Sequence, residues 1–172
     1  GMCSGGTSVT QTVYFEEDFS DNSAGWTIDN EWQIGAATAS TGHVYGNPDP
    51  ATDHTLSTND NGVAGVVIGG NAATTPHPTY WLTSPVIDTS AVVGQLYVGY
   101  WRWLNSDYTP FMQNTVEVYD GTAWQVLWQS GGSPGVQDMA WTQDSNDITA
   151  FKNSQMQIRF GFDVGSSGVF TV

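Results

Sequence analysis

The chain has 172 residues, a length that suits one domain able to bury a core of its own. Hydrophobic residues make up 39% and aromatic residues 13%, which argues against a disordered chain. The formal charge of −14 disfavours binding to nucleic acid and to anionic membrane surfaces. It favours divalent cations as partners, because carboxylates and carbonyl oxygens suit hard ions.

The start of the chain is rich in Gly and Ser and contains the one cysteine, Cys3, so no intramolecular disulfide can form. We interpret residues 1–11 as a flexible N-terminal segment or a cloning remnant, and residues 12–172 as a single β-sandwich domain. Cys3 is then a lipid-modified cysteine, the end of an upstream Cys-rich segment, or a spare thiol. No apolar run approaches the ~20 residues of a membrane-spanning helix, so we expect no direct membrane insertion.

The first half of the chain predicts short strands around a long loop. Thr12 to Phe19 is the first predicted strand. Trp26 to Ile34 predicts a tight hairpin with its turn at Asp29-Asn30. Residues 35–61 are polar with little periodicity, and loops of this length in compact domains usually bind something or are disordered. Val63 to Ile68 predicts a short buried strand.

Tyr80 to Leu104 contains the strands around which the rest of the chain is expected to be organised. Alternation divides its second half into two faces. One face carries Leu96, Val98, Tyr100 and Leu104. The other face carries Tyr97, Trp101 and Trp103. Because both faces carry apolar bulk, we predict a strand in the middle of a sandwich, with a layer or a binding surface over each face.

The second half of the chain continues with strands. Thr115 to Tyr119 alternates, and Asp120-Gly121 predicts a hairpin turn into a strand from Trp124 to Trp128. Gln155 to Val164 shows the clearest alternation of all. Helical periodicity is absent. Many short strands joined by Gly/Pro turns predict an all-β fold, a two-sheet antiparallel jelly-roll sandwich.

A series of short motifs runs from residue 14 to residue 165. The motifs are Asp18-Phe19, Gly25-Trp26, Glu31-Trp32, Asp53-His54-Thr55, Leu82-Thr83-Ser84-Pro85, Leu96-Tyr97-Val98-Gly99-Tyr100-Trp101, Val116-Glu117-Val118 and Gln157-Ile158-Arg159-Phe160. Their order and spacing resemble those of the MAM family, an extracellular concanavalin-like jelly-roll module, and of its bacterial relatives in secreted proteases and surface proteins. The cysteines of the animal modules are absent here, which suits the bacterial relatives. The family's closing strand, usually ending in an Asp pair, has no counterpart before Val172.

The resemblance implies a structural cation, Ca²⁺, beside the first strand and the Asp-His-Thr loop. Carried onto this sequence, its ligands would be Glu17, Asp18, Asp49 and Asp53, with backbone carbonyls completing the shell. The residue types fit, since calcium takes about six to eight oxygen ligands. The alternative is that these acids are solvated residues that cap turns. The family's late Asp pair cannot be placed, so one expected ligand is missing.

Patterns that would indicate catalysis are weak. Residues 131–135 match the G-x-S-x-G nucleophile elbow, but neither a helix nor a large α/β sheet is predicted around Ser133. His43, His54 and His77 form no zinc-binding pair. No strand carries the closely spaced carboxylates of a glycosidase. We therefore expect no enzyme activity, with a hydrolase domain as the least favoured alternative.

The eight tryptophans are the remaining functional signal. Exposed Trp and Tyr rings stack on sugars or anchor protein partners. The candidates for such a ligand-binding platform are Trp101, Trp103, Tyr97 and Tyr108, and the alternative is that these rings fill the core. We expect a non-catalytic, cation-stabilised adhesion or targeting module of a larger bacterial surface or secreted protein. Its partner would be a protein or a glycan on a cell surface or matrix, and a carbohydrate-binding module is the first alternative.

Overall fold

The computed structural model describes residues 10–55 and 59–172. Cys3 and most of the predicted N-terminal segment lie outside the described residues. The described chain is built from antiparallel strands, with one short 3₁₀ turn, η1 (Thr149–Phe151). The prediction of an all-β fold is therefore confirmed. In this part of the chain, no helix is long and apolar enough to cross a membrane.

One layer of the fold is a five-stranded sheet with the order β1-β4-β11-β7-β8. Its strands are β1 (Thr27–Ile28), β4 (His77–Thr83), β11 (Gln157–Val164), β7 (Met112–Tyr119) and β8 (Trp124–Gln129). β11 lies in the centre and pairs with both β4 and β7 along its length. Its alternation predicted the two faces of the strand, and Ile158, Phe162 and Val164 are buried while Arg159 lies on the opposite face.

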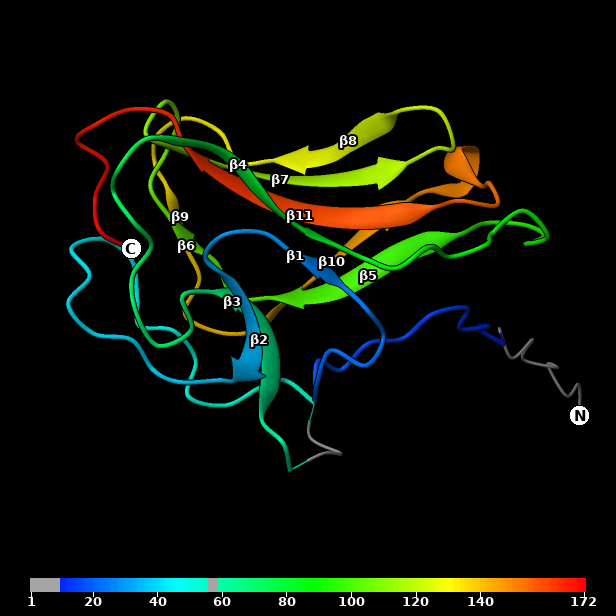
Figure 1. Cartoon of the computed structure of the whole chain (residues 1–172), viewed down its shortest axis with the longest axis horizontal. Helices are drawn as coiled ribbons and strands as arrows, with labels where there is room; N and C mark the ends of the chain where they lie inside the picture. The colour runs from blue at the N-terminus through cyan, green and yellow to red at the C-terminus, as the bar shows by residue number, and fades with distance from the viewer. Residues whose placement is uncertain (1–9, 56–58) are drawn as a thin grey trace, which may run out of the picture.

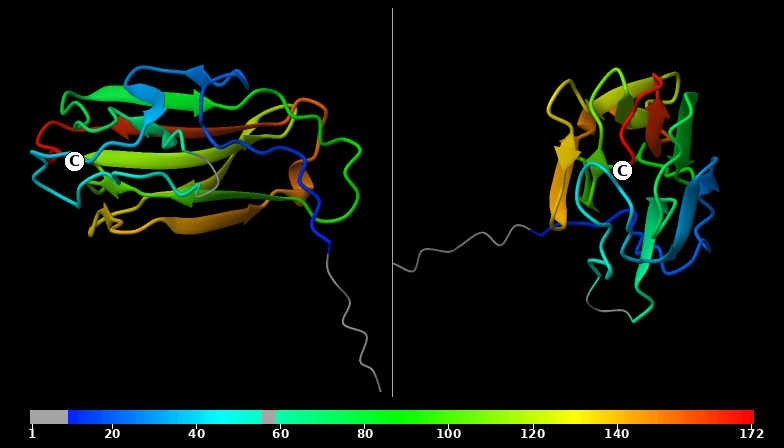
Figure 2. Two further views of the ribbon diagram at one scale, coloured as in Figure 1. Left: turned by 90° about the horizontal axis from the view of Figure 1, so that it is seen from below. Right: turned by 90° about the vertical axis from the view of Figure 1, so that its left-hand side faces the viewer.

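Three two-stranded sheets complete the described fold. They are β5 (Tyr97–Arg102) with β10 (Thr142–Asp147), β2 (Trp32–Ala36) with β3 (Gly62–Val66), and β6 (Asn105–Ser106) with β9 (Val136–Gln137). The β5–β10 pair lies across from the five-stranded sheet, which gives a sandwich-like arrangement (Figure 1; Figure 2). The second layer is thus divided into small sheets.

The prediction that β5 occupies the middle of the sandwich is wrong. Among the described residues β5 pairs only with β10, and the central strand is β11. β5 nevertheless carries apolar residues on both faces. The reason is that its outer face holds a cluster of aromatic rings under a loop, and alternation alone does not distinguish this from a central strand.

Two predicted elements in the first half are also wrong. Residues 12–19 form no strand, and the Val13 and Tyr14 side chains are exposed. Residues 26–34 form no hairpin, because β1 pairs with β4 while β2 pairs with β3. Glu31 adopts a left-handed φ of 66°, and this turn passes the chain from one sheet to the other.

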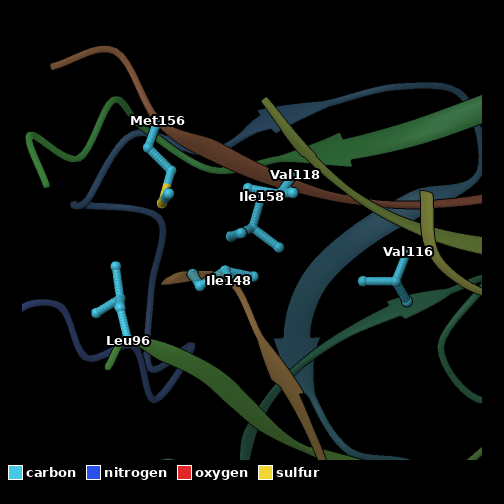
Figure 3. Close-up of a cluster of buried hydrophobic side chains, with 6 residues drawn as sticks. All are labelled: Leu96, Val116, Val118, Ile148, Met156 and Ile158. Carbon is cyan, nitrogen blue, oxygen red and sulfur yellow. The ribbon is translucent and has the colours of Figure 1, made fainter. Parts of the chain in front are cut away.

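The core consists of two clusters at different places between the layers. The larger one joins Leu96, Val116, Val118, Ile148, Met156 and Ile158. In Figure 3, Leu96 and Ile148 lie across from Met156 and Ile158, so side chains from both layers close this part of the core. The smaller cluster joins Met112, Val164 and Val169.

Candidate ligand-binding surface

The outer face of β5 presents two large rings to solvent. Tyr97 and Trp101 lie four residues apart on the same face of the strand, and their side chains are 50% and 44% exposed. Gly99 lies between them, so no side chain separates the two rings. The neighbouring strand β10 places Gln143 opposite Trp101 and Ser145 opposite Gly99. The result is a strip of aromatic rings bordered by polar side chains.

Three further rings extend this strip. His54 stacks on Trp101, with 3.6 Å between the ring centroids and 16° between the planes. Trp141 lies edge-on to His54 at 6.4 Å and edge-on to Trp103 at 5.8 Å. We call Tyr97, Trp101, Trp103, Trp141 and His54 the aromatic surface. It combines two residues of β5, Trp103 just after β5, Trp141 just before β10, and His54 of the long loop.

The long loop is fastened to the aromatic surface by the ring nitrogens. The Nε1–H of Trp103 donates to the carbonyl oxygen of Pro48, and the Nε1–H of Trp141 donates to that of Thr52, both at 3.1 Å. Hydrogen bonds satisfy these indole groups when they are covered by other residues. The loop thereby holds the Trp103 and Trp141 rings in place.

Asn61 fixes the same loop from its other end. Its amide Nδ2 donates to the carbonyl oxygens of Ala37 and Ala51, both at 3.0 Å. Its Oδ1 accepts the backbone N–H of Asp53 at 2.7 Å. This one side chain sets the position of the loop just before His54, so the stack of His54 on Trp101 has a structural support.

The inner face of β5 holds the strand firmly. The Tyr100 ring packs edge-on against Phe160 at 5.0 Å, and burial, aided by the charge of Asp144, raises the pKa of Tyr100 to about 12. Arg102 binds Asp138 through two nitrogens, at 2.9 and 3.2 Å, and Asp144 at 3.2 Å. A strand fixed in this way presents the rings on its other face in one geometry, which is what a preorganised binding surface requires.

The structure brings together three of the four residues predicted for a platform. Trp101, Trp103 and Tyr97 belong to the aromatic surface, whereas Tyr108 packs edge-on against Phe111 at 5.5 Å, between β6 and β7. His54 and Trp141 were missed by the sequence reasoning. Their contacts join residues 38 to 89 positions apart, and no local pattern signals such contacts.

The acids predicted to bind calcium occupy two different surroundings. Glu17 accepts hydrogen bonds from the backbone N–H of Phe19 at 2.8 Å and from Nε1–H of Trp26 at 2.9 Å. Hydrogen bonds from Ser20 lower the pKa of Asp18. Glu17, Asp18 and Thr55 line a shared hollow, so the N-terminal acids do lie beside the end of the Asp-His-Thr loop.

The other two predicted calcium ligands, Asp49 and Asp53, lie in surroundings different from those of Glu17 and Asp18. Asp49 lines the space between the layers, and burial raises the pKa of its carboxyl group. Asp53 Oδ2 is buried and accepts no hydrogen bond from the described residues. Across residues 10–55 and 59–172, no three or more His, Cys, Asp or Glu side chains are grouped to hold a metal ion. Of the four predicted ligands, only Asp53 offers a buried oxygen that a cation would satisfy.

The residues considered for catalysis have structural partners. Glu117 binds Arg159 with 2.7 Å between its Oε2 and the Arg159 Nε. Ser133 lies in an exposed connection that is followed by β9, where a nucleophile elbow would need a helix. His77 packs against Tyr80, with 3.9 Å between the ring centroids. None of these contacts creates a nucleophile paired with a base.

Comparisons of this chain with models of protein families, with curated proteins and with solved structures give no match. The resemblance to the MAM family is therefore a prediction from the sequence motifs.

Proposed function

We propose that this chain is a non-catalytic binding module of a larger bacterial secreted or cell-surface protein, and that it recognises its ligand through the aromatic surface. The exposure of Tyr97 and Trp101 on a strand with a fixed inner face supports this proposal most directly. Rigid, exposed aromatic rings are the usual anchors of recognition surfaces. The MAM-like motifs favour an extracellular location and a jelly-roll topology.

A glycan ligand is the second candidate, and the arrangement of side chains on β5 and β10 favours it. Ring faces on one strand stack against apolar faces of sugar rings, and Gln143 and Ser145 on the next strand offer hydrogen bonds to hydroxyl groups. Gly99 leaves space between Tyr97 and Trp101 for a bulky ligand. If the ligand is a protein, the same rings would insert as anchors into pockets on the surface of that protein.

A calcium ion near Asp53 is part of this proposal. The ion would use the Asp53 carboxylate with backbone carbonyls, because Glu17 and Asp18 are not grouped with Asp53 among the described residues. It would hold the loop that carries His54 against Trp101. Asp49 is left out of this ligand set, because it lines the space between the layers.

The test compares two exposed aromatic residues. Trp101→Ala removes the centre of the aromatic surface, and Phe170→Ala removes a ring of similar exposure (46%) outside it. Binding is measured on a glycan array and on immobilised matrix proteins. We expect Trp101→Ala to weaken binding by about ten-fold or more, as for a hot-spot residue, while Phe170→Ala leaves it unchanged.

Circular dichroism and thermal unfolding of both variants control for loss of fold. Binding to glycans supports the carbohydrate-binding candidate, and binding to proteins alone supports the adhesion candidate. Equal effects of the two substitutions would contradict the assignment of the aromatic surface. Hydrolysis of an ester, peptide or glycan that is lost in Ser133→Ala or Glu117→Gln would contradict the non-catalytic function.

A further inference from the structure

One long edge of β5 has no partner strand among the described residues. β5 pairs with β10 alone, and the register from Tyr97 to Arg102 has no irregularity. The N–H of Ile148 donates to the carbonyl oxygen of Leu96, the residue directly opposite, at 2.9 Å, so these two form a hydrogen-bonded pair. In an antiparallel ladder such pairs recur at every second residue. Leu96 and every second residue after it, up to Arg102, are therefore bonded to β10.

The residues between these pairs point their backbone groups the other way. Tyr97, Gly99 and Trp101 turn their N–H and C=O groups away from β10, toward the free edge. No described residue donates to these backbone groups or accepts from them. Gly99 is exposed, and because glycine has no side chain, its exposed surface is the backbone itself. The free edge is thus a row of unpaired donors and acceptors beside the rings of the aromatic surface.

The free edge of β5 lacks the features that usually prevent a strand from pairing with another chain. Proline, lysine and β-bulges commonly serve this purpose. β5 contains no proline or lysine, and its one charged residue, Arg102, is held by Asp138 and Asp144. By contrast, β8 at the edge of the five-stranded sheet has an irregular register opposite Val116 and Glu117. The β5 edge is therefore open to an added strand.

The surroundings of the edge indicate the composition of such a strand. Its inward side chains would enter the hollow between the layers, whose lining includes Ala64 and Val66 of β3 and Tyr100 of β5. Its outward side chains would lie beside the rings of Tyr97 and Trp101. The chain has 17 Asp and Glu residues against three Lys and Arg residues, which favours a basic partner.

We propose that an extended segment of a partner protein, in which apolar side chains alternate with basic and polar ones, adds antiparallel to the free edge of β5. This proposal rests on the proposed function, because the rings of the aromatic surface would contact the outward side chains of the added strand. Backbone hydrogen bonds supply affinity in this mode of recognition, and alternate side chains supply specificity. A sugar chain offers no matching row of N–H and C=O groups, so the edge favours a peptide over a glycan.

The experiment uses a capped, fluorescently labelled peptide, Thr-Val-Lys-Val-Thr-Val-Lys-Val-Thr, and follows its binding to the full chain by fluorescence anisotropy. One control peptide carries N-methyl groups on the valines, and the other carries them on the lysines and the central threonine. In an antiparallel pair, residues that exchange hydrogen bonds share a face, so the outward lysines and threonines donate to β5. We expect a Kd on the order of 10–100 μM for the unmodified and the valine-methylated peptide. Binding of the other control should be weaker by about ten-fold or more.

Two substitutions of Gly99 test the edge from the side of the protein. Gly99→Pro removes a backbone N–H that β10 does not use, and an edge strand tolerates proline where its N–H faces solvent. Gly99→Ala keeps this N–H and is the matched control, since the nearest neighbour of the added Cβ is the Asp144 carbonyl oxygen at 3.7 Å. We expect Gly99→Pro to weaken peptide binding by about ten-fold or more and Gly99→Ala to change it by less than about three-fold. Circular dichroism verifies the fold of both variants, and the methylated peptides test the same edge without any substitution.

Absence of peptide binding, or equal binding of the three peptides, would overturn the proposal, because backbone pairing would then play no part. A dimer of the chain that Gly99→Pro abolishes would also overturn it, since a second copy would then occupy the edge. Glycan binding without peptide binding would leave the aromatic surface as a glycan site. Peptide binding that is lost in Gly99→Pro and unchanged in Trp101→Ala would contradict the aromatic surface instead, so the two proposals fail separately.

Discussion

Two surfaces of this molecule carry aromatic rings, and they differ in what covers those rings. On the outer face of the five-stranded sheet, the Arg159 guanidinium lies between Trp81 at 3.8 Å and Trp124 at 3.9 Å, and Glu117 binds the same guanidinium. On β5, His54 stacks on Trp101, and Trp101 stays 44% exposed. The chain's own cation occupies the first set of rings. We therefore propose the second set of rings, on β5, for recognition of a partner.

The glycines in the two sheets show the same contrast. The Trp81 ring lies across Gly161 of β11, and a Cβ added there would be 2.4 Å from Trp81 Cε3. A Cβ at Gly99 of β5 would have its nearest neighbour, the Asp144 carbonyl oxygen, at 3.7 Å. Gly161 is therefore part of a packed structure, whereas a Cβ at Gly99 would make only an ordinary van der Waals contact. Composition alone does not separate a structural ring from one that is available for binding.

The largest expected effect is found by making a glycine-to-alanine substitution once in each sheet and comparing the two losses of stability. Gly161→Ala should destabilise the fold by about 2 kcal/mol, because the new methyl group displaces Trp81 from Arg159. Gly99→Ala should change stability by less than about 0.5 kcal/mol. Urea unfolding at neutral pH measures both. Equal losses would mean that the two outer faces are packed alike, contrary to the comparison above.

A smaller effect, on the free energy of unfolding at high pH, distinguishes the two faces of β5. The folded chain keeps the Tyr100 proton up to about pH 12, whereas an unfolded phenol loses it near its ordinary pKa of 10.0. The unfolded state therefore binds fewer protons between these values, and the free energy of unfolding falls as pH rises. We expect a loss of about 1–2 kcal/mol over this window that is absent in Tyr100→Phe.

Tyr97→Phe on the outer face is the matched control. This side chain is 50% exposed, and its substitution should leave the alkaline loss of stability as large as in the unmodified chain. Urea midpoints at pH 9.5 and 11.5 measure the difference. An alkaline loss that persists in full in Tyr100→Phe would show that another group causes it.

The smallest expected effect concerns the loop over the aromatic surface. A chelator should lower the melting temperature by about 2–4 °C, since an ion at Asp53 contributes roughly 1 kcal/mol, and added calcium should restore it. Asp53→Asn should remove this response because its carboxylate oxygen is lost. Differential scanning fluorimetry measures the shift. An unchanged melting temperature at every chelator concentration would remove the metal from the proposal.

Local patterns predicted the strand β11 and the hairpin of β7 and β8. The alternation from Gln155 to Val164 and the Asp120-Gly121 turn correspond to β11 and to the β7–β8 hairpin, in which Gly121 adopts a φ of 96°. Alternation succeeds here because each side chain of a paired strand faces either the core or the solvent. The same argument placed Tyr97 and Trp101 on one face of β5.

Partners distant in the sequence decided the remaining features. β1 and β2 joined different sheets, residues 12–19 paired with none of the described strands, and Tyr108 packed on Phe111. His54 reached Trp101 because Asn61 and the indole hydrogen bonds set the path of the loop. A sequence pattern records which way a side chain points from its own strand. Which group it meets there depends on how the layers pack, and this determined which tryptophans became structural and which stayed exposed.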